Sequence, residues 1–268
     1  MFRQLIPYRL TGPVQLDEDS LGEALAAQPF PDPYTGWTSP WTAVEDSLVH
    51  QPQARVFHIA LGLQGSDDGP SPRPIKIHGL IDLQDQWLLV DAPTEDLAEC
   101  FLTALTSAIG PLPIAPLTVR SSPPAVFGTW FTQAPPLGVE LNDFCLLHGS
   151  HGEVEVVQLA PEAESPDTVS RLLRAGFQPH ELGLVWNRAL RCRLDDRLRI
   201  SHLAPAEVLP RHPGEPLPET WPWAVSSHYE DPWSELDDAV GRVLQVARPF
   251  LRSLPALFGG ENTAAYGP

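Results

Sequence analysis

The sequence predicts a fold of short β-strands and a few amphipathic helices, packed as one large domain or as two close lobes. Its 268 residues can bury a substantial core, and 43% of them are hydrophobic. Only 19% are charged, and the 31 prolines exceed average usage, which indicates many short elements joined by stiff turns. Three widely spaced cysteines predict reduced core thiols in a cytoplasmic protein: Cys100, Cys145 and Cys192.

The first lobe, expected over 1–120, opens with a strand pattern at 2–10 and a short helix capped by Ser20. Buried strands are expected at 54–63 and 75–83. Between them, QGSDDGPSPRP (64–74) has no apolar anchor and predicts an exposed turn. No apolar run approaches the ~18 residues that span a bilayer, so we expect no membrane association.

A strand, a helix and a stiff apolar connector are expected in succession over 87–117. Thr94 caps a helix pattern over 94–109, in which apolar residues recur every three or four positions. The connector GPLPIAPL that follows is too apolar for an ordinary surface loop and too rich in proline for a central strand. Its side chains at Leu112, Ile114 and Leu117 should therefore be buried against the helix.

The second lobe, expected over 121–268, begins with AVFGTWF and an extended segment. The alternation in GEVEVVQL predicts a strand with one solvent-facing side, and SPDTVSRLLRAG predicts a short helix. Residues 180–203 are typical of a long hairpin, whereas 204–233 show little periodicity. The chain closes with an amphipathic helix pattern that we expect Pro249 to interrupt.

Charge limits the classes of partner. The formal net charge is −17, and Lys76 is the only lysine, so nearly all positive charge is arginine. Such a protein repels polyanions at long range, and any nucleic-acid contact requires a locally concentrated basic patch. The hairpin carries such a concentration, at Arg188, Arg191, Arg193, Arg197 and Arg199.

A turn at 194–196 would place Arg193 opposite Arg197 and Arg191 opposite Arg199. The other face would hold Leu190, Cys192, Leu198 and Ile200. Like charges directly opposite each other cost stability, which either a polyanion or the protein's own carboxylates would relieve. The residues alone favour internal neutralisation.

Catalytic motifs are absent from the sequence, which contains no P-loop, GxGxxG, GxSxG or HExxH pattern. His148 and His151 lie in a glycine-rich turn without an obvious third metal ligand. Paired aspartates at 67–68, 195–196 and 237–238 fit turns and a helix start better than acid–base chemistry. We therefore expect no enzyme, no cofactor and no metal site; a hydrolase using the histidine turn is the weakest alternative.

Several segments, in their order along the chain, resemble the RdgC family of recombination-associated DNA-binding proteins. They are Phe2 with Tyr8-Arg9-Leu10, Gly36-Trp37, the segment 87–117, Trp130, Leu184 with Trp186, Asp195-Asp196, and Gly259-Gly260-Glu261. The resemblance implies an α+β fold and a ring-shaped homodimer that encircles duplex DNA without reading its sequence. It also implies a nucleoid-associated role in limiting the access of the recombinase RecA to DNA, without enzyme activity.

On this resemblance, the expected DNA contacts are the five hairpin arginines together with Arg171, Arg174 and Lys76. Two departures bear on it: the family's long helical finger is reduced here to 64–74, and the chain is strongly acidic. The alternative is an acidic relative that has lost DNA binding and engages a DNA-binding protein or a recombinase. Arginines paired with carboxylates would support that alternative. A dimer is expected to use the C-terminal helix, through Leu244, Phe250, Leu251, Leu254 and Leu257.

Overall fold

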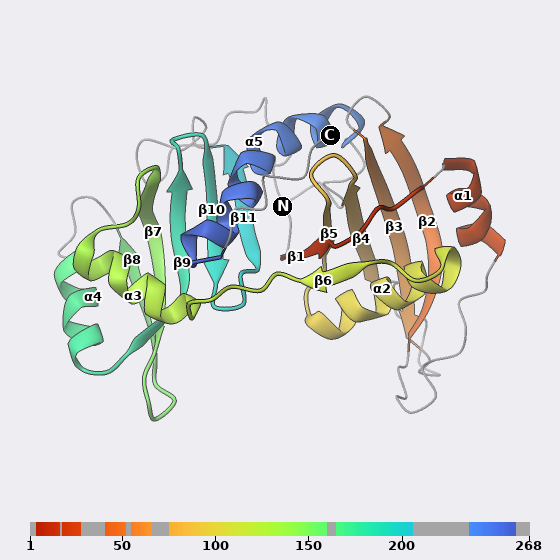
Figure 1. Ribbon diagram of the computed structural model, residues 1–268. Helices are drawn as coiled ribbons and strands as arrows, with labels where there is room; N and C mark the ends of the chain where they lie inside the picture. Colours follow the sequence, from red (N-terminus) through yellow and green to blue (C-terminus); the bar gives the residue numbers. More distant parts are fainter. Residues whose placement is uncertain are drawn as a thin grey trace. The chain divides into compact units, whose positions relative to one another are not determined.

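The computed structural model describes residues 4–16, 18–27, 41–51, 55–65, 75–159, 165–205 and 236–260. It confirms the α+β class, with helices packed on antiparallel sheets (Figure 1). The chain divides into two compact units, Arg3–Leu117 and Thr118–Pro268, the latter grouped with Met1–Phe2. No helix in the described ranges is long and apolar enough to cross a membrane.

The N-terminal unit is an antiparallel sheet with two helices. Its strands follow the order β2-β3-β4-β5-β1, and β6 pairs with β1. In chain order the elements are β1 (Leu5–Leu10), α1 (Glu18–Ala27), β2 (Trp41–Gln51), β3 (Val56–Gly65), β4 (Ile75–Asp82), β5 (Trp87–Asp91), α2 (Glu95–Ile109) and β6 (Ile114–Pro116). The expected turn at 64–74 falls largely outside the described residues, because β3 runs to Gly65 and β4 begins at Ile75.

The strand β2 does not follow from its sequence pattern. It pairs with β3 along its length, but a bulge between Glu45 and Ser47 shifts the alternation by one residue. The period of two that would identify a strand is therefore broken in its middle.

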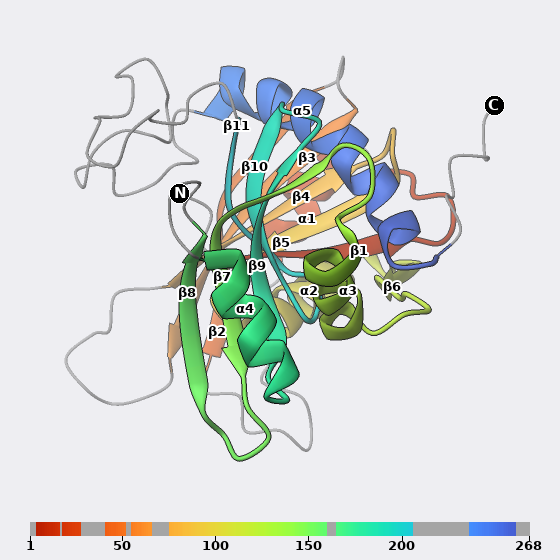
Figure 2. The same ribbon diagram turned by 90° about the vertical axis from the view of Figure 1, so that its left-hand side faces the viewer.

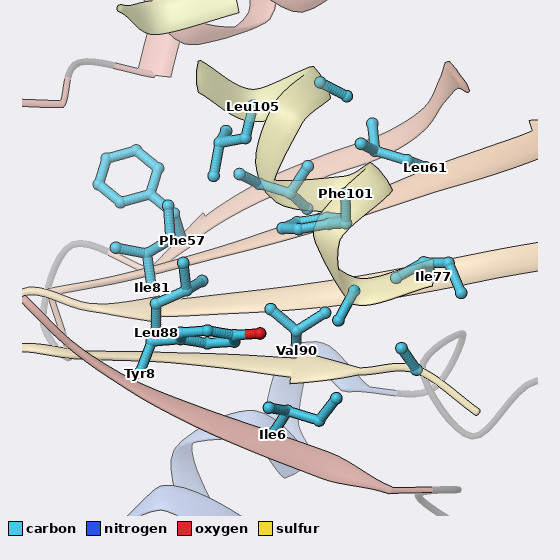
Figure 3. Packing of buried hydrophobic residues seen from close by; sticks show 14 of the residues in the cluster. Ile6, Tyr8, Phe57, Leu61, Ile77, Ile81, Leu88, Val90, Phe101 and Leu105 are labelled. Carbon is cyan, nitrogen blue, oxygen red and sulfur yellow. The ribbon is translucent and has the colours of Figure 1, made fainter. Parts of the chain in front are cut away.

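The helix α2 forms where the sequence predicts it. Thr94 Oγ1 accepts a hydrogen bond from the backbone N–H of Leu97 at 3.4 Å, and Gly110 ends the helix with φ 84°. The buried side of α2, centred on Phe101 and Leu105, packs against the apolar side chains of the sheet (Figure 3).

The connector after α2 forms an edge strand on β1. Ile114 pairs with Leu10 and Pro116 with Tyr8, while Thr11 N–H donates to the Pro113 carbonyl at 2.6 Å. Leu112, Ile114 and Leu117 have lost most of their exposure, as expected, and Leu112 and Ile114 pack against the core. They remain half-buried because the connector lies at the margin of the sheet.

The C-terminal unit contains five antiparallel strands in the order β11-β10-β9-β7-β8. Helix α3 packs on β9, α4 on β8 and α3, and α5 on β10. Its elements are α3 (Pro123–Gln133), β7 (Val139–His148), β8 (Val154–Leu159), α4 (Ser165–Arg174), β9 (Gln178–Trp186), β10 (Leu190–Asp195), β11 (Ile200–Pro205) and α5 (Leu236–Leu257).

One helix of this unit was not predicted, and two expectations need correction. AVFGTWF, to which the sequence assigned no element, is helical, because the prolines before it occupy the first turn of α3, where a missing N–H costs nothing. Pro249 is exposed and lies inside an unbroken α5. Phe250, Leu251 and Leu254 of this helix are buried within the single chain, so they cannot form the dimer surface that the sequence suggested.

Gly79 offers a test of how α2 packs on β4. A Cβ atom at this position would lie 2.1 Å from Cζ of Phe101, whose side chain is fully buried in the core. We expect Gly79→Ala to lower the free energy of unfolding by about 1–3 kcal/mol in urea titrations. Gly128→Ala is the matched control, since a Cβ on Gly128 in α3 meets nothing within 4 Å. Equal unfolding midpoints for both variants would contradict this packing.

Candidate nucleic-acid interface

The arginine-rich segment forms three antiparallel strands rather than one two-stranded hairpin. β9 pairs with β10 from Trp186↔Leu190 to Glu181↔Asp195, and β10 pairs with β11. Arg188 lies in the turn between β9 and β10, whereas Arg197 and Arg199 lie between β10 and β11. The structure therefore places these arginines at opposite ends of β10.

The expected facing pairs, Arg193 with Arg197 and Arg191 with Arg199, are wrong. Arg193 lies opposite Ser201 on β11 and opposite Gly183 on β9. Oδ1 of Asp195 accepts hydrogen bonds from the backbone N–H groups of Arg197 at 2.9 Å and Arg199 at 2.8 Å. These bonds lengthen the turn to residues 196–199, and β11 begins only at Ile200.

The expected apolar face of this segment is confirmed. Its members are almost fully buried: Leu190, Cys192, Leu198 and Ile200. Alternation along β10 places Arg191 and Arg193 on the other side of the sheet, where both are half-buried. Burial raises the pKa of the Cys145 thiol to about 12 and also raises that of Cys192, which fits free core thiols.

Three hairpin arginines pair with the protein's own carboxylates. Arg188 Nε lies 3.0 Å from Glu140 Oε1 in an exposed pair. The Arg191 guanidinium pairs with Asp143, and the Arg199 guanidinium with Asp195, and both pairs are largely buried. Burial raises the pKa of the Asp195 carboxyl, and its hydrogen bonds from Arg199 and Arg197 oppose that rise.

Arg193 stacks on an aromatic ring. Its guanidinium carbon lies 3.8 Å from the ring centroid of Phe144, a geometry that favours the cation. Phe144 and Asp143 reach the arginines because β7 departs from regular pairing with β9 between Leu141 and Cys145. A Cβ on Gly183 would lie 2.2 Å from the carbonyl oxygen of Asn142, so glycine is required beside this irregularity.

Sequence reasoning missed these partners of the arginines. Glu140, Asp143 and Phe144 belong to GVELNDFCLLHG, which was identified only as extended. The polar run ELND within an otherwise apolar strand could have marked these residues as functional. Which side chains they contact, however, depends on the order of the strands in the sheet.

The remaining predicted cations lie elsewhere. Arg171 and Arg174 are exposed in the last turn of α4, a favourable position for cations near the helix C-terminus. Lys76 is half-buried on β4 and belongs to the N-terminal unit. Within the described ranges, no ion pair is seen for Arg171, Arg174 or Arg193.

The two histidines of the predicted glycine-rich turn, His148 and His151, lie in different surroundings. His148 stacks on His180 with ring centroids 4.1 Å apart, and His180 Nδ1 lies 2.7 Å from Asp196 Oδ2. His151 is exposed and is not part of this stack. Among the residues whose placement is described, no group of three or more His, Cys, Asp or Glu side chains could hold a metal ion.

His202 lies on the arginine side of β11. Burial and the guanidinium of Arg193 lower the pKa of this imidazole, Asp143 opposes that effect, and Arg191 adds to it. The folded chain therefore disfavours the charged form of His202, and the ring Nδ1 lies 3.1 Å from the Ser201 hydroxyl.

Known proteins similar to this chain are recombination-associated proteins. The family model described as "Putative exonuclease, RdgC" matches residues 72–216. The recombination-associated protein RdgC of Pseudomonas aeruginosa LESB58 is 26% identical over 310 aligned residues, which cover 97% of this chain and 98% of that protein. The RdgC of Laribacter hongkongensis is 26% identical over 189 residues, covering 70% of this chain and 59% of that protein.

The aligned length with the Pseudomonas protein exceeds the 268 residues of this chain, so that relative contains residues without counterparts here. The family model covers more than half of the chain, and the two chains align almost end to end. The chain belongs to the RdgC family.

Proposed function

We propose that the chain acts in recombination by binding duplex DNA without reading its sequence, and thereby limits the access of RecA to the DNA. Membership of a family whose relatives are named recombination-associated supports this role. Arginines on a sheet and at a helix end offer charge to phosphates rather than side chains to base edges.

The arginines outside internal ion pairs are the proposed contacts. Arg171 and Arg174 are exposed, and Arg193 stacks on Phe144 without an ion pair among the described residues. This is the observation that carries the proposal. The charge of Arg193 opposes the rise that burial causes in the pKa of the Glu181 carboxyl, so part of it is already offset. Each cation that binds a phosphate releases counterions, and three contacts give a salt slope of about −3. Binding by one chain is therefore weak and steeply salt-dependent.

The paired arginines have a structural role in this proposal. Arg191 and Arg199 are bound to Asp143 and Asp195, and removing one partner leaves the other charge largely buried. They hold the strands that present Arg193. A replacement of these two arginines should therefore affect stability more than binding.

We infer that binding suffices for this role and that no hydrolytic step is needed, although the matching family model is described as an exonuclease. Incubation of linear duplex with the protein and Mg²⁺ or Mn²⁺ tests this inference. Intact DNA is expected, and shortened strands that disappear on heat inactivation of the protein would contradict it.

A second candidate is the acidic relative that binds a protein instead of DNA. The three ion pairs favour it, because Arg188, Arg191 and Arg199 already have carboxylate partners. A formal net charge of −17 also favours a basic partner surface. Here RecA or another DNA-binding protein would be bound directly.

Replacing the three arginines outside ion pairs separates the two candidates. For Arg171→Gln/Arg174→Gln/Arg193→Gln, we expect duplex affinity to fall more than tenfold at about 50 mM salt, and the salt slope to approach zero. Fluorescence anisotropy with two unrelated duplexes of equal length measures the affinity and the salt slope. The wild type should bind the two duplexes with equal affinity.

The matched control is Arg191→Gln/Arg199→Gln. It should lower the melting temperature while leaving most of the salt slope, because it breaks the largely buried pairs. Absence of measurable duplex affinity of the wild-type protein at low salt would contradict the DNA proposal. Retained binding to RecA in that case would support the second candidate.

His202 predicts a pH dependence of stability. Its pKa is lowered in the folded chain, so the unfolded chain binds the proton more readily. The free energy of unfolding should therefore fall as the pH falls below about 6.5, the ordinary histidine pKa. His202→Asn removes the titrating imidazole and should therefore reduce this loss of stability. Asparagine is chosen because it tolerates the positive φ of 53° at this position. His151→Asn, at an exposed site, should leave it unchanged in urea titrations at several pH values.

A further inference from the structure

His202 lies at a strained position of β11, beside the arginines of β10. The strands β7, β9, β10 and β11 belong to one sheet (Figure 2). The register between β10 and β11 shifts between Arg191 and Arg193, so that His202 and Leu203 both lie opposite Cys192. The backbone of His202 has φ 53° at this bulge. Bulges redirect side chains, and strained residues concentrate at binding and active sites, so this histidine is a candidate ligand contact.

A second irregularity, on β7, lies beside the same arginines. β7 has the three residues 142–144 where β9 has only Gly183, and Asp143 among them has φ 37°. Gly183 pairs in turn with Arg193 of β10. The guanidinium carbon of Arg193 lies 3.8 Å from the ring centroid of Phe144. Irregular pairing on two separate strands therefore brings side chains to one guanidinium, which indicates a built site.

A chain of hydrogen bonds fixes which imidazole nitrogen of neutral His202 carries the proton. The Ser201 hydroxyl bonds to the Glu181 carboxyl, a contact that favours the ionised carboxylate. A hydroxyl has one proton, and the bond to the carboxylate uses it, so the Ser201 oxygen can only accept a further bond. His202 Nδ1 lies 3.1 Å from this oxygen and is therefore the donor. Neutral His202 then presents Nε2 as an acceptor without a proton.

The charged groups around His202 come from three strands. Burial and the Arg193 guanidinium of β10 disfavour the protonated imidazole, Asp143 of β7 favours it, and Arg191 of β10 adds to the disfavour. Glu181 of β9 acts through the hydroxyl that joins it to the imidazole. An anion that lies against both Arg193 and His202 would reverse this balance, because it attracts the proton that the two arginines repel.

We propose that His202 is a proton-gated contact for a backbone phosphate of DNA, which it binds together with Arg193 only when Nε2 is protonated. This inference rests on the proposed function, in which Arg193 contacts phosphate. An Nε2 without a proton cannot donate to a phosphate oxygen, so binding at this point takes up a proton. The proton comes from solvent, because the phosphates of duplex DNA are ionised. Duplex affinity therefore rises as the pH falls.

Calorimetric titration of the full chain with a short duplex, in buffers of different ionisation enthalpy, measures proton uptake directly. At about 50 mM salt, the wild type should take up about one proton per chain, and its affinity should rise by up to about tenfold per pH unit between about pH 8 and pH 6. His202→Asn should lose this uptake and this pH dependence, yet keep the salt slope that the arginines provide. His151→Asn, at an exposed site, is the matched control and should take up protons like the wild type.

Ser201→Ala tests the gate itself. Without the hydroxyl, neutral His202 can carry its proton on Nε2 and donate to a phosphate, so proton uptake should fall while affinity near pH 8 stays at or above that of the wild type. Circular dichroism checks that each variant folds. Duplex binding with equal proton uptake by the wild type and His202→Asn would overturn this proposal and leave the proposed function standing, as would full uptake by Ser201→Ala. A wild type without duplex affinity even at pH 6 would overturn both.

Discussion

The Asp195 carboxylate accepts hydrogen bonds from the backbone N–H groups of Arg197 and Arg199 and pairs with the Arg199 guanidinium. These contacts close the turn between β10 and β11 and determine where β11 begins. The register of β11 follows, and with it the burial of Leu198 and Ile200 on the core side. A largely buried carboxylate thus positions Arg197 and Arg199, whereas alternation along β10 positions Arg191 and Arg193.

Ion pairing with carboxylates divides the arginines of the C-terminal unit into two groups. Arg191 and Arg199 offset nearby carboxylates and stabilise the strands, whereas Arg171, Arg174 and Arg193 are left without an ion pair in the described residues. Net charge acts at long range and opposes approach to DNA, but a phosphate contact depends on local charge within a Debye length. On the proposed function, DNA binding is therefore restricted to low salt.

Sequence reasoning predicted the elements whose signals are local. The helix 94–109 was predicted from its cap, its apolar spacing and its terminating glycine, and the structure contains it as Glu95–Ile109. The apolar side of the arginine segment was also predicted, because it depends only on alternation along the strand. Family resemblance, rather than composition, predicted the RdgC assignment.

Features that depend on strand order or on irregular pairing were not predictable in this way. The bulge in β2 shifts its alternation by one residue, so the strand pattern is interrupted. Two prolines in the first turn of α3 make its start look like a loop in the sequence. The partners of the arginines lie on β7, which is separated from β10 in sequence and joined to it only through β9. The pairing of Arg191 with Asp143 could therefore be recognised only from the folded sheet. The pairs of arginines that a simple two-stranded hairpin would place opposite each other do not occur among the described strands.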